Sequence, residues 1–322
     1  MSDISSPAVA PQQQKKSFYQ RSRQATLDSI ASDTNYDWLF QNIRFFLEYP
    51  QQVYLQHGSI RTDDELEQQL KLLWFKTIEA AKVFAADDEA RQYKLVAWIA
   101  AARARENVQS TTQDPFEADG GKVMWRDLPF FKVALEEAWG GRASLSKDAW
   151  TNLNAFVSRL AAVTGMDLMR FGLETIREAL EEERPIYPTG DGGDTGEKSV
   201  ADLLPAALLW LKHTHSFMST RLPPIERAVK DGVEPPSGCG ESVAPGDLAT
   251  ADGVSRNGMS LTRQTFWRRR LFEIGECSGD QDPTAKDAHD FAKRMGTWPL
   301  HWPSDLRDVP GYEEPVKYDA SA

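Results

Sequence analysis

The carboxylate cluster at residues 63–67 is the first stretch of this sequence that could do chemistry. It reads Asp-Asp-Glu-Leu-Glu, a spacing similar to the aspartate-rich sites that hold magnesium diphosphate through carboxylate oxygens. Thr62 comes immediately before the cluster and Glu65 three residues after Thr62, which is the pattern of a capping box. We therefore interpret the cluster as the acidic first turn of a helix and not as a metal site.

A glycine-rich stretch at residues 190–199 is similar to a phosphate-binding loop. Glu197 separates its last glycine from Lys198, and the stretch follows a helical pattern and not a strand. Both features depart from the phosphate-binding motif, so the sequence favours a flexible linker.

Ser144 and Lys147 have the serine–lysine spacing that some acyl-transfer enzymes use. The companion motifs of those enzymes are absent, and Ser146 is placed to cap the helix that follows. We predict a structural role here and assign no catalytic residue.

The histidines offer little chemistry. His213 and His215 are two residues apart on a predicted helix, which places them about 200° apart around its axis, so they cannot share a metal ion. His215 falls toward the apolar face and is predicted to be a buried structural histidine. No pattern of His, Cys, Asp or Glu has zinc spacing, and we predict neither a metal nor another cofactor.

A basic and aromatic segment, Phe-Trp-Arg-Arg-Arg, occupies residues 266–270. Arg268, Arg269 and Arg270 form a possible basic patch for phosphate, nucleic acid or an acidic partner. A packing stripe through Trp267 explains the segment better, with the arginines paired to acidic side chains.

Arg159 is the only charged residue in the stretch 149–165. We expect it to reach Glu174 or Glu178 on the next helix, either as a structural tie or as the anchor of an anion pocket. The possible pocket for a ligand or partner comprises Trp125, Arg159, Glu178, Trp210 and His215.

Apolar residues at three- and four-residue spacing predict an all-α fold, a single compact multi-helix domain of about nine helices. The expected helices cover residues 37–48 (ended by Pro50), 62–85, 88–106, 129–139, 146–164, 167–183, 199–220, 262–276 and 284–295. The expected organisation is a disordered N-terminal segment at 1–24, a helical core at 25–221, a disordered Pro/Gly-rich insertion at 222–261, C-terminal helices at 262–296 on the same core, and an extended tail at 297–322 that carries Trp298 and Trp302.

Composition narrows the function further. The 322 residues carry 37 Lys and Arg against 48 Asp and Glu, a net charge of −11, which argues against nucleic acid as the main partner. Two cysteines give no disulfide framework, no long apolar run predicts a membrane span, and no Asn-x-Ser/Thr acceptor occurs. We expect an intracellular protein, cytoplasmic or nuclear and not secreted.

Several short motifs also occur together in a known family. The motifs are Lys94-Leu95-Val96 before Trp98, Trp125 to Pro129, Trp150 to Leu160, Arg177 to Glu181, Pro205 to Ala207, and Phe266-Trp267 before Arg269-Arg270-Leu271. In this order they resemble a fungal family catalogued as domain of unknown function 3632, over roughly residues 37–276. The resemblance implies a fungal, intracellular, helical protein, and it implies no activity, catalytic residue or ligand.

Three functions remain open from the sequence. The first is a non-catalytic helical scaffold or protein-interaction protein, because no convergent catalytic groups are visible. The second is an enzyme or small-molecule binder whose site is assembled from distant helices around Arg159. The third, which the charge disfavours, is nucleic-acid association through residues 262–270.

Overall fold

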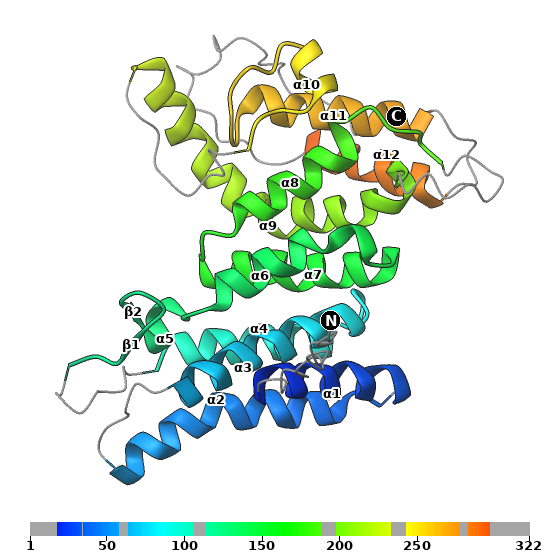
Figure 1. Cartoon of the computed structure of the whole chain (residues 1–322). Coiled ribbons are helices and arrows are strands. Elements are labelled where there is room, and N and C mark those ends of the chain that lie inside the picture. Colours follow the sequence, from blue (N-terminus) through cyan, green and yellow to red (C-terminus); the bar gives the residue numbers. More distant parts are fainter. Residues whose placement is uncertain are drawn as a thin grey trace, which may run out of the picture. The chain divides into compact units, whose positions relative to one another are not determined.

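Helices make up nearly all of the regular structure (Figure 1). The computed structural model describes residues 18–33, 35–57, 64–105, 114–187, 198–232, 243–276 and 283–296. Within these ranges it has twelve α-helices, one 3-10 helix and one hairpin of two short strands. The predicted all-α fold is confirmed, with more helices than the nine expected.

The chain folds into two compact units. The first comprises residues 1–80 and 106–134, and the second comprises residues 81–105 and 135–322. Neither unit is one continuous stretch of chain, because the segment 81–105 of the second unit lies between the two segments of the first.

The first unit is built around α3. Trp74 in this helix is fully buried, donates a hydrogen bond from Nε1 to the carbonyl oxygen of Pro129 at 2.6 Å, and meets the Phe131 ring edge-on at 5.1 Å. Lys76 is also buried, where its ammonium donates to Thr26 Oγ1 and Asn42 Oδ1, and burial lowers its pKa. The elements of this unit are α1 (Phe18–Ser32), α2 (Asp37–His57), α3 (Asp64–Val83, whose last turn belongs to the second unit), β1 (Glu117–Ala118), β2 (Lys122–Val123) and α5 (Met124–Asp127).

Two predictions about this unit were wrong. Pro50 does not end α2, which continues to His57 with the proline inside it, because a proline removes one backbone hydrogen bond and bends a helix without always stopping it. The N-terminal boundary at residue 24 was also wrong, since α1 begins at Phe18. Residues 1–17, the proposed cap Thr62 and the tail 297–322 with Trp298 and Trp302 lie outside the described residues.

The second unit is centred on α7, which packs against α4 and α9, while α8 packs against α9 and α11 against α12 (Figure 1). As predicted, Ser146 caps α7 by accepting a hydrogen bond from the Ala149 amide, and most side chains from Trp150 to Ala161 are buried. Its elements are α4 (Glu89–Arg103), α6 (Phe131–Gly140, which begins in the first unit), η1 (Arg142–Ser144), α7 (Lys147–Thr164), α8 (Met169–Leu180), α9 (Val200–Lys230), α10 (Asp247–Ala251), α11 (Leu261–Glu276) and α12 (Pro283–Gly296).

The predicted disordered insertion at 222–261 is the largest correction. Helix α9 continues to Lys230, residues 243–261 are described, and residues 233–242 lie outside the described residues. A fully buried ion pair holds the second part: Arg263 donates to both carboxylate oxygens of Glu181, at 2.6 and 2.9 Å, and to the Val243 and Gly258 carbonyls. Hydrogen bonds from side chains thus pair the backbone carbonyl groups of this loop and hold it in place. The loop has no apolar periodicity, so the sequence pattern could not predict that it is ordered.

Candidate functional site on helices α6 to α9

Trp125 and Trp210, two residues of the predicted pocket, lie in the interior of the protein. Both rings are fully buried, and Trp125 belongs to the first unit whereas Trp210 belongs to the second. Trp210 donates from Nε1 to Asn154 Oδ1 at 2.7 Å and lies so close to Gly172 that a Cβ there would meet its ring at 2.5 Å. Their role is to fill the interior, as expected for tryptophans at helical spacing.

Contrary to the prediction from the sequence, Arg159 does not reach Glu174 or Glu178. Its side chain is buried, its Nη2 donates to the Ala86 carbonyl at 2.9 Å, and the guanidinium lies 5.3 Å from the centre of the Tyr93 ring. Its Nε and Nη1 have no hydrogen-bond partner. The arginine extends toward α4, because the side of α7 that carries it packs on that helix.

His213, and not His215, is the histidine that faces α7. Its Nδ1 lies 2.8 Å from Ser158 Oγ, and burial together with the nearby Arg159 cation lowers the pKa of His213 to about 3. His215 instead contacts Lys212 and Ser216 on its own helix. Ser158 and His213 do not make a catalytic pair, because Ser158 is fully buried and so weakly basic an imidazole is a poor general base near neutral pH.

The three arginines of the basic segment point to different acceptors. Arg268 donates to the Ala292 carbonyl, Arg269 pairs with Asp252, and Arg270 pairs with Glu273 at 3.0 Å. They do not form one free basic patch, which supports the structural role favoured from the sequence.

The remaining sequence motifs give no site. Residues 190–197 of the glycine-rich stretch lie outside the described residues, while Ser144 donates to the Gly141 carbonyl and is not paired with Lys147 in the described contacts. Across the described ranges, no three side chains of His, Cys, Asp or Glu are grouped to hold a metal ion. Within the same ranges, no helix combines the length and apolar character needed to cross a membrane.

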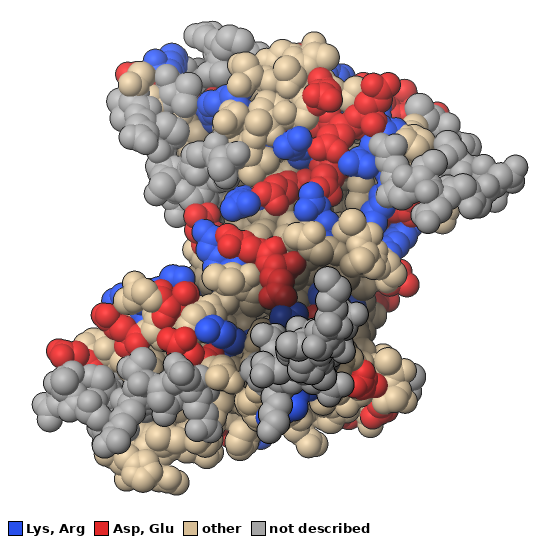
Figure 2. Space-filling model, viewed as in Figure 1, with Lys and Arg blue, Asp and Glu red and all other residues tan. Residues whose placement is uncertain are grey.

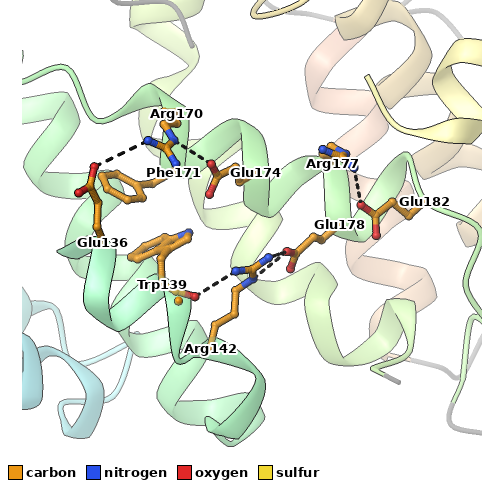
Figure 3. A pocket seen from close by; sticks show the side chains of 10 residues that line it. Glu136, Trp139, Arg142, Arg170, Phe171, Glu174, Arg177, Glu178 and Glu182 are labelled. Carbon is orange, nitrogen blue, oxygen red and sulfur yellow. Dashed lines mark hydrogen bonds and ion pairs between the residues drawn. The ribbon is translucent and has the colours of Figure 1, made fainter. Parts of the chain in front are cut away.

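A groove rich in paired charges lies between α6, η1 and α8 (Figure 3). Its volume is about 370 Å³. We call it the mixed-charge groove, and its lining residues are Glu136, Trp139, Gly140, Arg142, Arg170, Phe171, Glu174, Arg177, Glu178 and Glu182. Figure 2 shows acidic and basic side chains intermixed on the surface over α8.

Ion pairs cross the mixed-charge groove and run along α8. Arg142 of η1 donates to Glu178 of α8, with Nε at 2.7 Å from Oε1, and also to the Trp139 carbonyl. Arg170 pairs with Glu174 one turn later at 2.9 Å, and with Glu136 of α6 at 3.7 Å. The hydrogen bond that Arg142 donates to Glu178 raises the pKa of Arg142, so the guanidinium is a permanent cation.

Two tryptophans in edge-to-face contact belong to this region. Trp139 meets Trp150 at a ring-centre distance of 4.9 Å and Phe171 at 4.8 Å, and Figure 3 shows the Trp139 ring between Phe171 and Arg142. Both indoles are buried, yet neither Nε1 has a hydrogen-bond partner. Buried indole N–H groups normally have one, so each of these is an unsatisfied buried donor.

A second space of about 310 Å³ adjoins the first and shares Gly140, Arg142 and Glu178 with it. We call it the cationic lobe, because three of its lining side chains are cations and only one is a carboxylate. Its lining residues are Gly140, Arg142, Ala143, Trp150, Glu178, Arg184, Lys198 and Leu203.

Connecting segments place the cations of the cationic lobe. Arg184, which follows α8, donates to the Glu178 carbonyl and pairs with Glu182 at 2.7 Å. Lys198, which precedes α9, donates to the carbonyls of Arg142 and Leu145, each at 3.1 Å. Burial lowers the pKa of Lys198, and both of these acceptors are neutral.

Charged, aromatic, apolar and glycine residues make up the lining of these two spaces. Among the described residues that line them there is no serine, threonine, cysteine or histidine, so these walls offer no such nucleophile or imidazole base. Of the predicted site residues, only Glu178 lies here. The arginines of α8 could have been found from the charged face of the predicted helix, since Arg170 and Glu174 have i, i+4 spacing. Arg142, Arg184 and Lys198 lie in connections with no such signal.

The family comparison agrees with the order of motifs in the sequence. The model of the family described as Protein of unknown function (DUF3632) matches residues 74–271, a range that holds α4 to α10, most of α11 and both spaces described above. No curated protein and no solved structure matches the chain significantly. The match covers more than half of the chain, which therefore belongs to the DUF3632 family.

Proposed function

We propose that this chain is a non-catalytic protein-interaction protein that acts in the cytoplasm or nucleus and binds its partner in the mixed-charge groove. The observation that carries the proposal is the composition of the groove, where seven of ten lining residues are charged, four acidic and three basic. Small-molecule sites are mostly apolar with a few polar groups, so this lining fits a protein surface better.

The charge pattern indicates the chemistry of the partner. Arg170, Glu174 and Arg177 follow one another along α8 with alternating sign, and a segment with the opposite alternation would exchange these ion pairs for its own. Complementary charges on two binding surfaces contribute more to the specificity and rate of association than to its affinity. We therefore propose a protein segment that carries both acidic and basic side chains.

The alternative, an enzyme or small-molecule binder around Arg159, has weaker support. Trp125 and Trp210 are packed in the interior, and Arg159 is directed to Ala86 and Tyr93. The notable features left around Arg159 are one buried cation and one neutral histidine, which belong to the packing of α4, α7 and α9.

A charge swap tests the proposed function. The double variant Arg170→Glu/Glu174→Arg keeps the net charge and an i, i+4 ion pair but reverses the pattern of the groove. The matched control is Arg44→Glu/Glu48→Arg in α2, which inverts a pair with nearly the same separation, 2.8 Å against 2.9 Å. Both variants should keep the helical circular dichroism of the unchanged chain.

The readout has two steps. First, we select the proteins that the unchanged chain and the control capture from native extract but the groove swap does not. These proteins are then purified and titrated against all three chains. We expect the Kd to rise at least about tenfold for the groove swap alone, since one specific charged contact contributes about 1.4 kcal/mol or more. Capture that is the same for all three chains, or self-association of the chain as the only interaction, contradicts the proposal.

A further inference from the structure

The cationic lobe has a surplus of positive charge at a point where three connecting segments meet. Arg142, Arg184 and Lys198 line the recess with one carboxylate, Glu178. Arg184 also pairs with Glu182 outside this lining, so one positive charge is left after these pairs. The surplus is local, because the whole chain has a net charge of −11. An acidic protein that concentrates cations in one recess of about 310 Å³ attracts anions there.

The cations differ in how well they are neutralised. Arg142 is bound to Glu178 and Arg184 to Glu182. Lys198 donates only to neutral carbonyl oxygens in its described hydrogen bonds, although Glu178 and Asp202 favour its charge from a distance. Burial opposes that charge and lowers the pKa of Lys198, and an anion beside the ammonium would offset this cost.

A neutral donor completes the recess. Trp150 lines the cationic lobe and is almost fully buried, and its Nε1 has no hydrogen-bond partner. An oxyanion is the acceptor that suits an indole N–H, a lysine ammonium and arginine guanidinium groups together. A cation or an apolar ligand would offer no acceptor to any of these donors.

We propose that the cationic lobe binds a phosphate group, with Lys198, Arg184 and Arg142 as its charged ligands and Trp150 Nε1 as an additional donor. A phosphate monoester carries about −1.5 to −2 charges near pH 7 and three acceptor oxygens, so it can meet Lys198 and the guanidinium groups at once, whereas a carboxylate has one charge and two oxygens. The proposal goes beyond the proposed function, because it concerns a different ligand and needs no partner protein in the mixed-charge groove.

Titration of the full chain with inorganic phosphate, followed by calorimetry and by the indole N–H signals in a ¹H–¹⁵N spectrum, tests this site. Loss of one signal in Trp150→Phe identifies the Trp150 indole. We expect saturable binding at constant ionic strength that shifts this signal, with Kd raised about tenfold or more in Lys198→Gln and in Arg184→Gln. Lys293→Gln is the matched control, because this exposed lysine lies on α12 and should leave Kd unchanged.

The source of the phosphate is tested separately with a pair of serine peptides, one phosphorylated and one not. Equal affinity for inorganic phosphate and the phosphopeptide indicates a free phosphate or small phosphorylated molecule. Tighter binding of the phosphopeptide that Arg170→Glu/Glu174→Arg weakens indicates a phosphorylated protein segment that also occupies the mixed-charge groove.

Three results would overturn the site: no saturable phosphate binding, equal binding of chloride, or a Kd unaffected by both Lys198→Gln and Arg184→Gln. If Lys198→Gln unfolds the chain, Arg184→Gln and Trp150→Phe still decide the question. The two proposals fail independently, since phosphate binding is measured without a partner, and the groove swap leaves every residue of the cationic lobe in place.

Discussion

At the scale of single residues, His213 is the group whose protonation the fold constrains most clearly. Burial and the neighbouring Arg159 cation keep the imidazole neutral in the folded chain. The folded pKa of about 3 lies below the ordinary value of 6.5, so only the unfolded chain gains a proton as the pH falls below 6.5. The stability contributed by this difference is complete above pH 6.5 and is lost progressively toward pH 3.

We therefore predict that His213→Gln flattens the pH dependence of stability. Between pH 6.5 and 5, the free energy of unfolding should fall by up to about 1 kcal/mol per pH unit in the unchanged chain, after allowance for partial exposure. The variant should show a smaller slope over this range. Urea unfolding at several pH values measures it, and identical slopes would contradict the assignment.

Arg159 gives a second residue-scale prediction. Because its Nε and Nη1 lack partners, the buried charge stabilises the fold little. Arg159→Met should leave the free energy of unfolding unchanged or raise it by about 1 kcal/mol. It should also raise the pKa of His213, since a cation that opposes imidazole protonation is removed. NMR of the imidazole follows this shift, and a loss of more than about 2 kcal/mol would mean that the guanidinium is better paired.

At the scale of elements, the ion pair between Glu181 and Arg263 joins the end of α8 to α11 and to the loop before it. Glu181 also accepts hydrogen bonds from Trp267 Nε1 and the Gly246 amide. A Cβ on Gly246 would lie 2.6 Å from the Glu181 carbonyl oxygen, so the close approach requires glycine there. The Glu181 carboxylate thus anchors residues 243–261, together with Glu226, which accepts hydrogen bonds from Arg256 and the Leu261 amide.

Removal of that charge should be costly. Glu181→Gln leaves the fully buried Arg263 without a counterion, and we expect a loss of about 3–5 kcal/mol in the free energy of unfolding. Earlier protease cleavage within residues 243–261 should accompany it. The control Glu273→Gln alters a half-exposed carboxylate on α11 and should change stability by less than about 0.5 kcal/mol. Equal losses of stability in the two variants would show that the buried ion pair does not hold α8, α11 and the loop together.

The contact between α8 and α9 depends on another glycine. A Cβ at Gly172 would lie 2.5 Å from Cε3 of Trp210, so Gly172→Ala should lower the free energy of unfolding by about 1–3 kcal/mol through overpacking. Gly140→Ala is the matched control, because no atom lies within 4 Å of its added Cβ. Thermal unfolding of both variants tests the contact, and a neutral Gly172→Ala would contradict it.

At the scale of the whole molecule, the negative net charge argues against nucleic acid as a binding partner. The chain carries −11 overall, and Arg269 and Arg270 of the basic segment are paired with carboxylates. We predict no binding of duplex DNA at about 150 mM salt, a common physiological ionic strength. A gel-shift titration with duplex DNA tests this prediction. The prediction would be contradicted by binding that weakens steeply with salt and is lost in the variant Arg268→Gln/Arg269→Gln/Arg270→Gln.

The sequence predicted helices far better than contacts between them. Apolar periodicity and the Ser146 cap defined α7 almost to the residue, because these signals are local. The partners of Arg159 and Glu178 could not be predicted, since the choice of acceptor depends on how α4, η1 and α8 are placed in space. The order at residues 243–261 was missed for the same reason, as Arg263 and Glu181 are 82 residues apart.

The interleaved chain path through the two units has a consequence for biosynthesis. Helix α4 leaves the ribosome before residues 106–134 that complete the first unit, and well before its own partner α7. Leu95, Val96 and Ile99 of α4 are buried in the folded protein. They are therefore exposed to solvent until α7 has been synthesised, and such exposed apolar residues are binding sites for chaperones. For the same reason, no single cut yields both units intact, and separate expression of either one requires the polypeptide to be rejoined in a new order.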